Sequence, residues 1–162
     1  MTSPLDPKAL RQVFGQFCTG VTAVCAADAD GRRWGITVNS FSSLSLDPPL
    51  ALFSVVRGSE SLKVIQAAGA FSINILADSQ QDISNALAKK GGSEKMDGVP
   101  TRTGVTGAPI IEGSIGHMDC VLHAEFDGGD HVILVGEIKQ AEVGEALPPL
   151  LYFRSGYKTL PA

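Results

Sequence analysis

The sequence of 162 residues lacks both a long apolar run and a cluster of basic residues. A membrane-spanning helix needs about 20 consecutive apolar residues, and binding to nucleic acid phosphates needs clustered cations. The chain instead has 13 basic and 17 acidic residues and a net charge of -4. Its N-terminal residues 1–12 are polar, without the apolar segment of a secretory signal. These absences predict a cytoplasmic protein that binds neither a membrane nor nucleic acid.

Cysteine is also scarce, and Cys18, Cys25 and Cys120 show no C-x-x-C spacing. An odd number of cysteines without metal-ligand spacing is typical of reduced thiols in an intracellular protein. Because cysteine packs like a small apolar residue, we expect all three in the core, with no redox dithiol among them.

Several catalytic signatures are missing as well. No G-x-G-x-x-G follows a predicted strand and no Walker A motif occurs, so a bound dinucleotide would not rest on a Rossmann cradle. G-x-S-x-G and H-E-x-x-H are also absent. His117, Asp119 and His123 share one face of a predicted strand and are a conceivable metal set. Polar residues on such a face usually point to water, however, and we predict no metal.

What the chain does have is turn-forming residues, with 18 glycines and nine prolines. Apolar runs and alternating patterns between them predict strands over 21–27, 34–40, 50–56, 70–76, 115–126 and 131–141. We expect helices over 7–17, 61–68 and 78–89, the last with Gln81 placed for a capping box, and a long loop over 91–110. The pattern favours one mainly β domain over residues 1–162, an antiparallel barrel with helices covering its ends.

Three segments carry polar groups suited to chemistry. In the first, residues 35–49, a predicted strand runs into hydroxyl and amide side chains and stops at two prolines. Neutral donors of this kind suit a flat polar heterocycle such as isoalloxazine. The simpler alternative is that serine and asparagine favour loops in any protein.

The second segment, residues 53–63, joins a strand end, Gly58 and several serines to the start of a helix. Helix N-terminal amides attract anions, and Arg57 and Lys63 add positive charge, so a phosphate would fit here. The alternative is a capped helix with a solvated arginine. The third segment is Gly129-Asp130-His131, a tight turn that places a histidine at the start of a strand, where an isolated histidine is more often structural.

Taken in order, these segments resemble the short-chain flavin reductase family, the reductase components of two-component flavin-dependent monooxygenases. The resemblance extends from Phe14 to Tyr157. It rests on six motifs: the opening at 17–22, G-I-T-V-N-S-F-S-S-L-S-L-D-P-P-L from residue 35, A-F-S-I-N-I-L at 70–76, G-D-H at 129–131, V-G-E at 135–137 and P-L-L-Y-F at 149–153.

The resemblance implies a flavin-binding split β-barrel that forms a homodimer. It further implies an NAD(P)H:flavin oxidoreductase that transfers hydride from NADH or NADPH to FMN or FAD. The reduced flavin would then diffuse to a separate oxygenase. At position 96, where the family often carries a phenylalanine, this chain has Met96. That difference puts a stacking role at this position in doubt.

The same resemblance assigns roles to single residues. His131 matches the histidine associated with nicotinamide binding and is the predicted catalytic residue. The flavin ring is predicted to lie along Thr37, Val38, Asn39, Ser40 and Phe41. The predicted phosphate segment comprises Ser54, Val55, Val56, Arg57, Ser59 and Ser61. The cofactor-binding set is completed by Asn74, Tyr152 and Tyr157, the two tyrosines belonging to a tail that closes over the site.

Three alternatives stay open. An enzyme of the pyridoxamine-phosphate oxidase type would need a basic cluster beyond Arg57 and Lys63, which the sequence lacks. A non-catalytic protein that stores or senses flavin would have no use for the nicotinamide contact implied at His131. A metal-binding barrel would use His117, Asp119 and His123.

Overall fold

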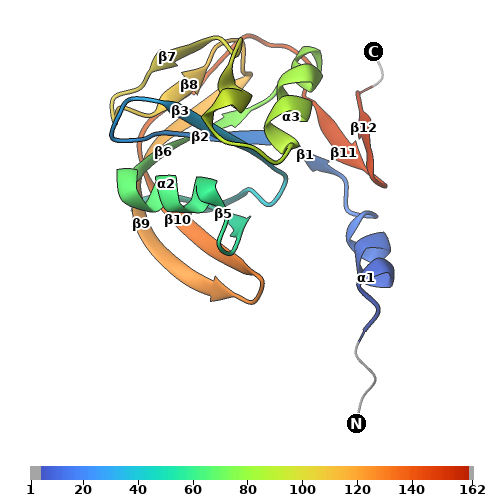
Figure 1. The fold of residues 1–162 in the computed structure, drawn as a ribbon. Helices are drawn as coiled ribbons and strands as arrows, with labels where there is room; N and C mark the ends of the chain where they lie inside the picture. Colours follow the sequence, from blue (N-terminus) through green and yellow to red (C-terminus); the bar gives the residue numbers. More distant parts are fainter. Residues whose placement is uncertain (1–4, 161–162) are drawn as a thin grey trace.

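The structure, a computed structural model, describes residues 5–160. Its main feature is a seven-stranded antiparallel sheet with the strand order β3-β2-β6-β9-β10-β5-β4, curled into an open barrel (Figure 1). The strands are β2 Thr22–Ala27, β3 Arg33–Val38, β4 Ser42–Leu46, β5 Pro49–Val56, β6 Ala70–Ile75, β9 Gly116–Gly128 and β10 His131–Val143. This confirms the predicted mainly β, antiparallel split barrel. The sheet is not closed, because β3 and β4 end it without pairing with each other.

The core lies inside this curled sheet. On β5, Ala51, Phe53 and Val55 are buried, whereas the residues between them are only partly buried. The ring of Phe53 meets that of Phe71 on β6 edge to face, with centroids 5.2 Å apart. Alternation on a strand therefore sends one face of β5 into the core and leaves the other available to a ligand or a neighbour.

Local signals in the sequence account for the helices. Helix α1 (Pro7–Phe14) begins at Asp6, whose carboxylate accepts a hydrogen bond of 3.1 Å from the amide of Lys8. Helix α2 (Glu60–Ala68) ends at Gly69, which has a left-handed φ of 63°. The third helical segment consists of a 3₁₀ turn η1 (Asp78–Gln80) followed by α3 (Gln81–Ala88). Its capping glutamine is Gln80, which accepts from the amide of Ala77 at 3.0 Å, and not the predicted Gln81.

The predicted loop over 91–110 contains regular structure. A 3₁₀ turn η2 (Ser93–Met96) precedes a short hairpin of β7 (Thr101–Thr103) and β8 (Pro109–Ile111). The Arg33 guanidinium anchors this region by donating to the carbonyls of Met96 and Val99. Met96 itself is 1% exposed and packs so closely on β3 that a Cβ at Gly35 would lie 2.5 Å from its sulfur. Met96 is thus a core residue.

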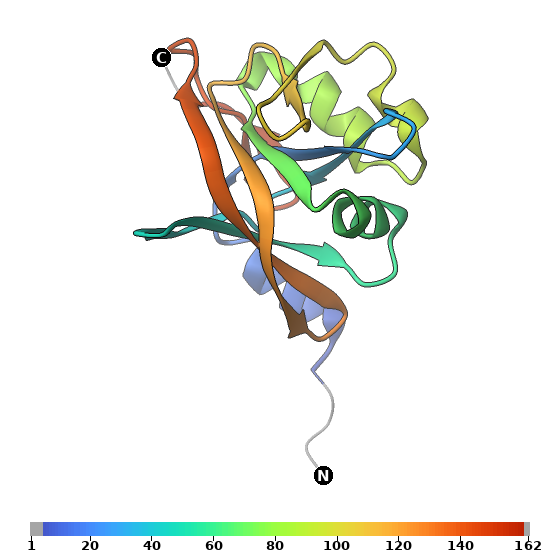
Figure 2. The same cartoon turned by 90° about the vertical axis from the view of Figure 1, so that its left-hand side faces the viewer.

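The β7–β8 hairpin changes the environment of β9, one of the two long strands shown in orange in Figure 2. Asp119 is fully buried and accepts a 3.0 Å hydrogen bond from the amide of Thr106, while His117 is buried within 3.2 Å of Arg102. The prediction that this face of the strand meets water is therefore wrong for these two residues, although His123 is exposed. Within residues 5–160, no three His, Cys, Asp or Glu side chains are grouped closely enough to hold a metal ion.

A second, three-stranded sheet joins the two ends of the chain. Strand β11 (Leu151–Phe153) lies between β1 (Thr19–Gly20) and β12 (Gly156–Lys158). The tail hairpin also contacts the chain just after α1, because the amide of Arg154 donates to the carbonyl of Gly15 at 2.9 Å. Helix α1 lies outside the barrel, below this sheet in Figure 1. Backbone hydrogen bonds of Leu150 with Val21 (3.1 Å) and Leu76 (3.0 Å) hold the tail on the barrel.

Two of the three thiols are in the core, as predicted. Burial raises the pKa of Cys25 and that of Cys120 to about 12, so neither is a nucleophile at neutral pH. Cys18 is exposed, because it lies in the segment between α1 and the barrel, and the prediction is wrong there. No helix among residues 5–160 is long and apolar enough to cross a membrane.

Candidate functional site

The first two predicted segments meet at the open side of the barrel. The hydroxyl of Ser40, just after β3, donates to the carbonyl of Ser54 at 3.1 Å and accepts from its amide at 2.9 Å. Ser54 lies near the end of β5, and a short turn connects β5 to α2. The predicted ring segment, 37–41, and the predicted phosphate segment, 54–61, are therefore adjacent in space.

The third segment lies beside the end of β5. Antiparallel pairing places His131 directly opposite Val56, on the face that points away from the core. The His131 ring is 40% exposed, and its Nδ1 lies 2.7 Å from the Asp130 carboxylate. This hydrogen bond with His131 is the main cause that lowers the pKa of Asp130. An ionised Asp130 keeps the proton on Nδ1 and leaves Nε2 available to a ligand.

Arg57 reaches the same turn. Its backbone amide donates to the carbonyl of Asp130 at 2.9 Å, and its guanidinium contacts the carbonyls of Gly129 (3.1 Å) and His131 (3.3 Å). The guanidinium also forms an ion pair with Asp127. The arginine predicted to bind phosphate is thus already bonded to the turn that carries His131.

The start of α2 has the geometry expected of an anion site. Gly58 turns the chain with φ 78°, and the Ser59 hydroxyl accepts from the amide of Leu62 at 3.2 Å. Ser61 is buried, and Lys63 pairs with Glu60 at 2.7 Å. The positive N-terminal end of α2 therefore lies just after the end of β5, where the amide of Ser59 donates to the carbonyl of Val56, while the Ser59 hydroxyl is used for capping.

A cleft of about 240 Å³ brings a ring-segment residue to the tail. Asn39 faces it from the loop after β3, and Tyr152 faces it from β11. Phe14 and Phe17 form its apolar wall from α1 and the segment that follows. The lining also includes the cationic side chain of Arg11. Amide and aromatic groups in one concave surface suit a flat heterocycle.

Thr37 and Tyr157 meet through a residue that the sequence did not point to. The Thr37 hydroxyl donates to the carbonyl of Ser84 at 2.7 Å, and the Ser84 hydroxyl lies 2.7 Å from that of Tyr157. Tyr157 contacts Tyr152 edge to face, with centroids 5.6 Å apart. A serine inside a predicted helix carries no local signal of such a contact, so sequence reasoning missed Ser84.

Other predicted residues are used within the protein. Asn74 is fully buried, and its amide donates to the carbonyl of Ala23 (3.0 Å) and to Ser72 (2.8 Å), so both N–H groups are occupied. The Val55 side chain lies in the core, and Phe41 packs partly against it. Val38 offers a carbonyl that already accepts from Thr22 at 2.9 Å. These positions shape the site through the backbone or through packing.

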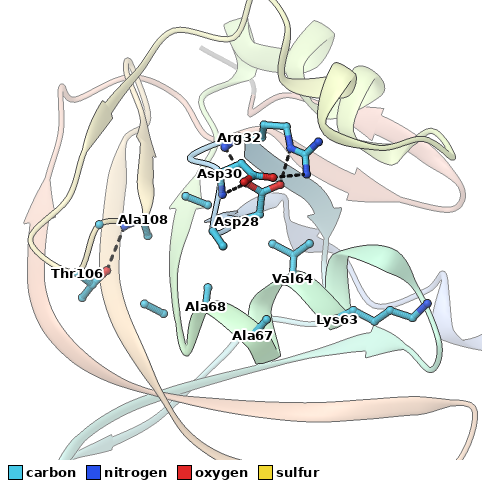
Figure 3. Close-up of a pocket in the computed structure, with 13 residues that line it drawn as sticks. Asp28, Asp30, Arg32, Lys63, Val64, Ala67, Ala68, Thr106 and Ala108 are labelled. Atoms are coloured by element: carbon cyan, nitrogen blue, oxygen red, sulfur yellow. Dashed lines mark hydrogen bonds and ion pairs between the residues drawn. The ribbon is translucent and has the colours of Figure 1, made fainter.

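A larger pocket of about 620 Å³ lies elsewhere, between the β2–β3 turn, α2 and the β7–β8 turn (Figure 3). Of the residues that the sequence predicted for the site, only Lys63 lines this pocket. Asp28 organises one side. Burial acts to raise the pKa of Asp28, but hydrogen bonds from Trp34 and Arg32 outweigh it and lower the pKa to about 2. The hydrogen bonds that Arg32 and Trp34 donate to Asp28 stabilise the β2–β3 turn.

The donor set fits a flavin better than a metal. Asn39, Tyr152 and the α2 N-terminus supply neutral donors, an aromatic wall and a place for phosphate. The hydroxyl of Thr19, paired opposite Tyr152 on β1, is buried without a hydrogen-bond partner among the residues described. At about 240 Å³, the cleft is smaller than the 300–1,000 Å³ typical of cofactor pockets.

Comparison with known proteins points the same way. Residues 14–161 match the family described as flavin reductase like domain. A flavin reductase of Pseudomonas putida is 41% identical over 155 residues, covering 96% of this chain and 91% of that protein. The reductase subunit HsaB of a flavin-dependent monooxygenase from Mycobacterium tuberculosis is 39% identical, covering 100% and 90%.

Solved structures agree. Component B of a nitrilotriacetate monooxygenase from Mycobacterium thermoresistibile superposes with a TM-score of 0.90 at 38% identity, covering 95% of this chain and 86% of that one. An NADH:FAD oxidoreductase of Streptomyces globisporus gives a TM-score of 0.90 at 32% identity, covering 100% and 99%.

Proposed function

This chain belongs to the flavin reductase like domain family, and from that premise we propose that it transfers hydride from NADH or NADPH to FMN or FAD. The observation that carries the proposal is the pairing of Val56 with His131. This pairing puts His131, the predicted nicotinamide-binding residue, beside the end of β5, where the predicted phosphate segment lies. A store or sensor of flavin would gain nothing from this arrangement.

The nicotinamide and the flavin supply the chemistry, since a reduced nicotinamide donates a hydride that flavin accepts. The protein has to place the two rings in contact and keep water out. In our proposal, Asn39 and Tyr152 hold the flavin ring while the first turn of α2 faces its phosphate. His131 orients the nicotinamide through Nε2, because Asp130 occupies Nδ1. No proton has to move through His131.

We propose that a separate oxygenase uses the reduced flavin. The relatives from Mycobacterium tuberculosis and Thermus thermophilus are named as reductase parts of flavin-dependent or 4-hydroxyphenylacetate monooxygenases. An open cleft supports a flavin that leaves after reduction and diffuses to its user. The need for a supply of reduced nicotinamide favours a cytoplasmic location.

We further propose a homodimer. Apolar side chains are strongly exposed on α1, on the segment after it and on β4, with Phe17 77% and Leu46 97% exposed. Phe14 and Phe17 line the same cleft, and exposed apolar side chains that lie together are typical of protein interfaces. The small cleft also leaves room for a second copy to cover the flavin. Sedimentation velocity tests this, since Phe14→Ser combined with Phe17→Ser should shift a dimer toward monomer. A wild-type monomer would contradict it.

The deciding experiment measures oxidation of NADH and of NADPH at 340 nm with FMN, with FAD and without flavin. We expect oxidation of at least one nicotinamide only when flavin is present. The preferred pair identifies both cofactors. Tight flavin binding without oxidation in any combination would favour the storage or sensor function instead.

A further inference from the structure

Ser84 occupies an unusual position in α3. Its side chain is fully buried, yet its hydroxyl is directed away from its own helix, to Tyr157 in the tail hairpin, 2.7 Å away. Its carbonyl accepts from the hydroxyl of Thr37 on β3, also at 2.7 Å. Ser84 therefore joins β3, which runs into the predicted ring segment, to the C-terminal hairpin.

Helix stability does not explain this serine. Serine is a poorer helix former than alanine, and a serine inside a helix usually points to solvent or bonds to the carbonyl one turn earlier. The hydroxyl of Ser84 instead bonds to a residue 73 positions away in the chain. A long-range contact from a buried hydroxyl points to a positional role.

The contact continues to the cleft. Tyr157 lies opposite Tyr152 in the β11–β12 hairpin, and their rings meet edge to face at 5.6 Å. Tyr152 and Asn39 both line the cleft. The path from Thr37 through Ser84 and Tyr157 thus ends at the tyrosine that faces the ring segment.

We propose that Ser84 is a positioning residue, which holds the tail hairpin at a set distance from β3 so that Tyr152 and Asn39 enclose the flavin ring. This rests on the proposed function, in which the ring lies along 37–41. It also reassigns Thr37 and Tyr157. Their hydroxyls bond to Ser84, so they support the cleft from behind rather than touching flavin.

Two variants test the inference from opposite sides of one hydrogen bond. Ser84→Ala and Tyr157→Phe each remove one hydroxyl, and alanine keeps the helix intact. Losing this hydrogen bond should weaken binding of FMN and FAD, followed by fluorescence quenching, about three- to tenfold. The KM for flavin should rise by the same factor, with the KM for nicotinamide unchanged. The double variant should be no weaker than either single one. Ser79→Ala, at an exposed serine of η1, is the matched control.

A second readout needs no cofactor. Hydrogen exchange of the amides in 151–158 should become faster in both variants, because the hairpin is released from α3. If nicotinamide is oxidised but both variants exchange and bind flavin as the wild type does, the role of Ser84 is disproved and the proposed function stands. An equal loss of kcat with all binding unchanged would also overturn it. If the wild type oxidises no nicotinamide, the proposed function fails. Hydrogen exchange in 151–158 then tests the Ser84–Tyr157 contact by itself, and unchanged exchange in both variants would disprove it.

Discussion

The hydroxyl of Ser40 bonds twice to the backbone of Ser54, donating to its carbonyl at 3.1 Å and accepting from its amide at 2.9 Å. A side chain here takes the place of a strand partner, because β3 and β5 approach each other without forming a ladder. This hydroxyl therefore helps to hold the chain after β3 against β5 at the open side of the barrel.

Replacing Ser40 with alanine should separate the two segments. We expect the free energy of unfolding to fall by about 1–3 kcal/mol, since an amide and a carbonyl of Ser54 lose their partner, and flavin affinity should fall as well. Urea unfolding and flavin fluorescence measure the two effects. Ser42→Ala, at an exposed serine bonded only to its neighbour's carbonyl, is the control. Equal stability of the two variants would contradict the bridging role.

Arg57 offers a test between two functions of one side chain. If it holds the turn of His131, both Arg57→Lys and Arg57→Ala should raise the nicotinamide KM several-fold, because lysine lacks the forked geometry that reaches two carbonyls and Asp127. If it binds a flavin phosphate, flavin affinity should fall instead, with partial rescue by lysine. Arg32→Lys, at another exposed and paired arginine, should change neither.

His131→Ala should raise the nicotinamide KM about tenfold, the loss expected for one hydrogen bond to the ligand. Binding of flavin alone should stay as in the wild type, because the proposed function gives the His131 side chain a contact with nicotinamide only. Steady-state kinetics at saturating flavin give the number. His123→Ala is the matched control on the neighbouring strand β9, and an effect there equal to that at His131 would argue against a specific contact.

Gly136 in the V-G-E motif is required by packing. A Cβ at this position would lie 2.6 Å from the Phe71 ring and 2.9 Å from the Cβ of Cys120. Gly136→Ala should therefore destabilise the fold by about 1–3 kcal/mol through overpacking, which thermal unfolding detects as a lower Tm. Gly20→Ala, where a Cβ meets nothing within 4 Å, should leave the Tm nearly unchanged.

Asp28 predicts a pH dependence of stability. Its pKa in the folded protein is about 2, below the ordinary 3.8, since hydrogen bonds from Trp34 and Arg32 outweigh the effect of burial. A lowered pKa means that ionised Asp28 stabilises the fold above about pH 4 and that this contribution is lost as the pH falls toward 2. Wild type and Asp28→Asn should therefore differ most at pH 7 and converge in acid, as followed by urea unfolding. A constant difference across this range would contradict the assignment.

Much of the fold could be read from local patterns. The helix α2 begins after the capping Ser59 and ends at Gly69, as its sequence indicates. The turn at Gly129, with φ 78°, joins two strands whose existence the alternation predicted. Such features depend on a few neighbouring residues and on backbone preferences, so they appear in the sequence itself.

The burial of Asp119 could not be predicted in this way. On its strand it alternates with apolar residues like any solvent-facing carboxylate. Only the β7–β8 hairpin, folded over that face, buries it and supplies Thr106 as its partner. The pairing of segments far apart in sequence depends on the whole packing, and a local pattern holds no record of it.

By itself, the sequence determined the architecture, the family resemblance and the three segments from which the site is built, because periodicity, turn residues and motif order are local properties. The tertiary structure decided which groups are free to act. In the folded chain, Arg57 is hydrogen-bonded to the turn that carries His131. Both N–H groups of Asn74 have partners inside the barrel. Ser84 connects Thr37 to Tyr157. These outcomes follow from three-dimensional proximity, since a polar side chain binds whichever partner the folded chain brings within about 3 Å.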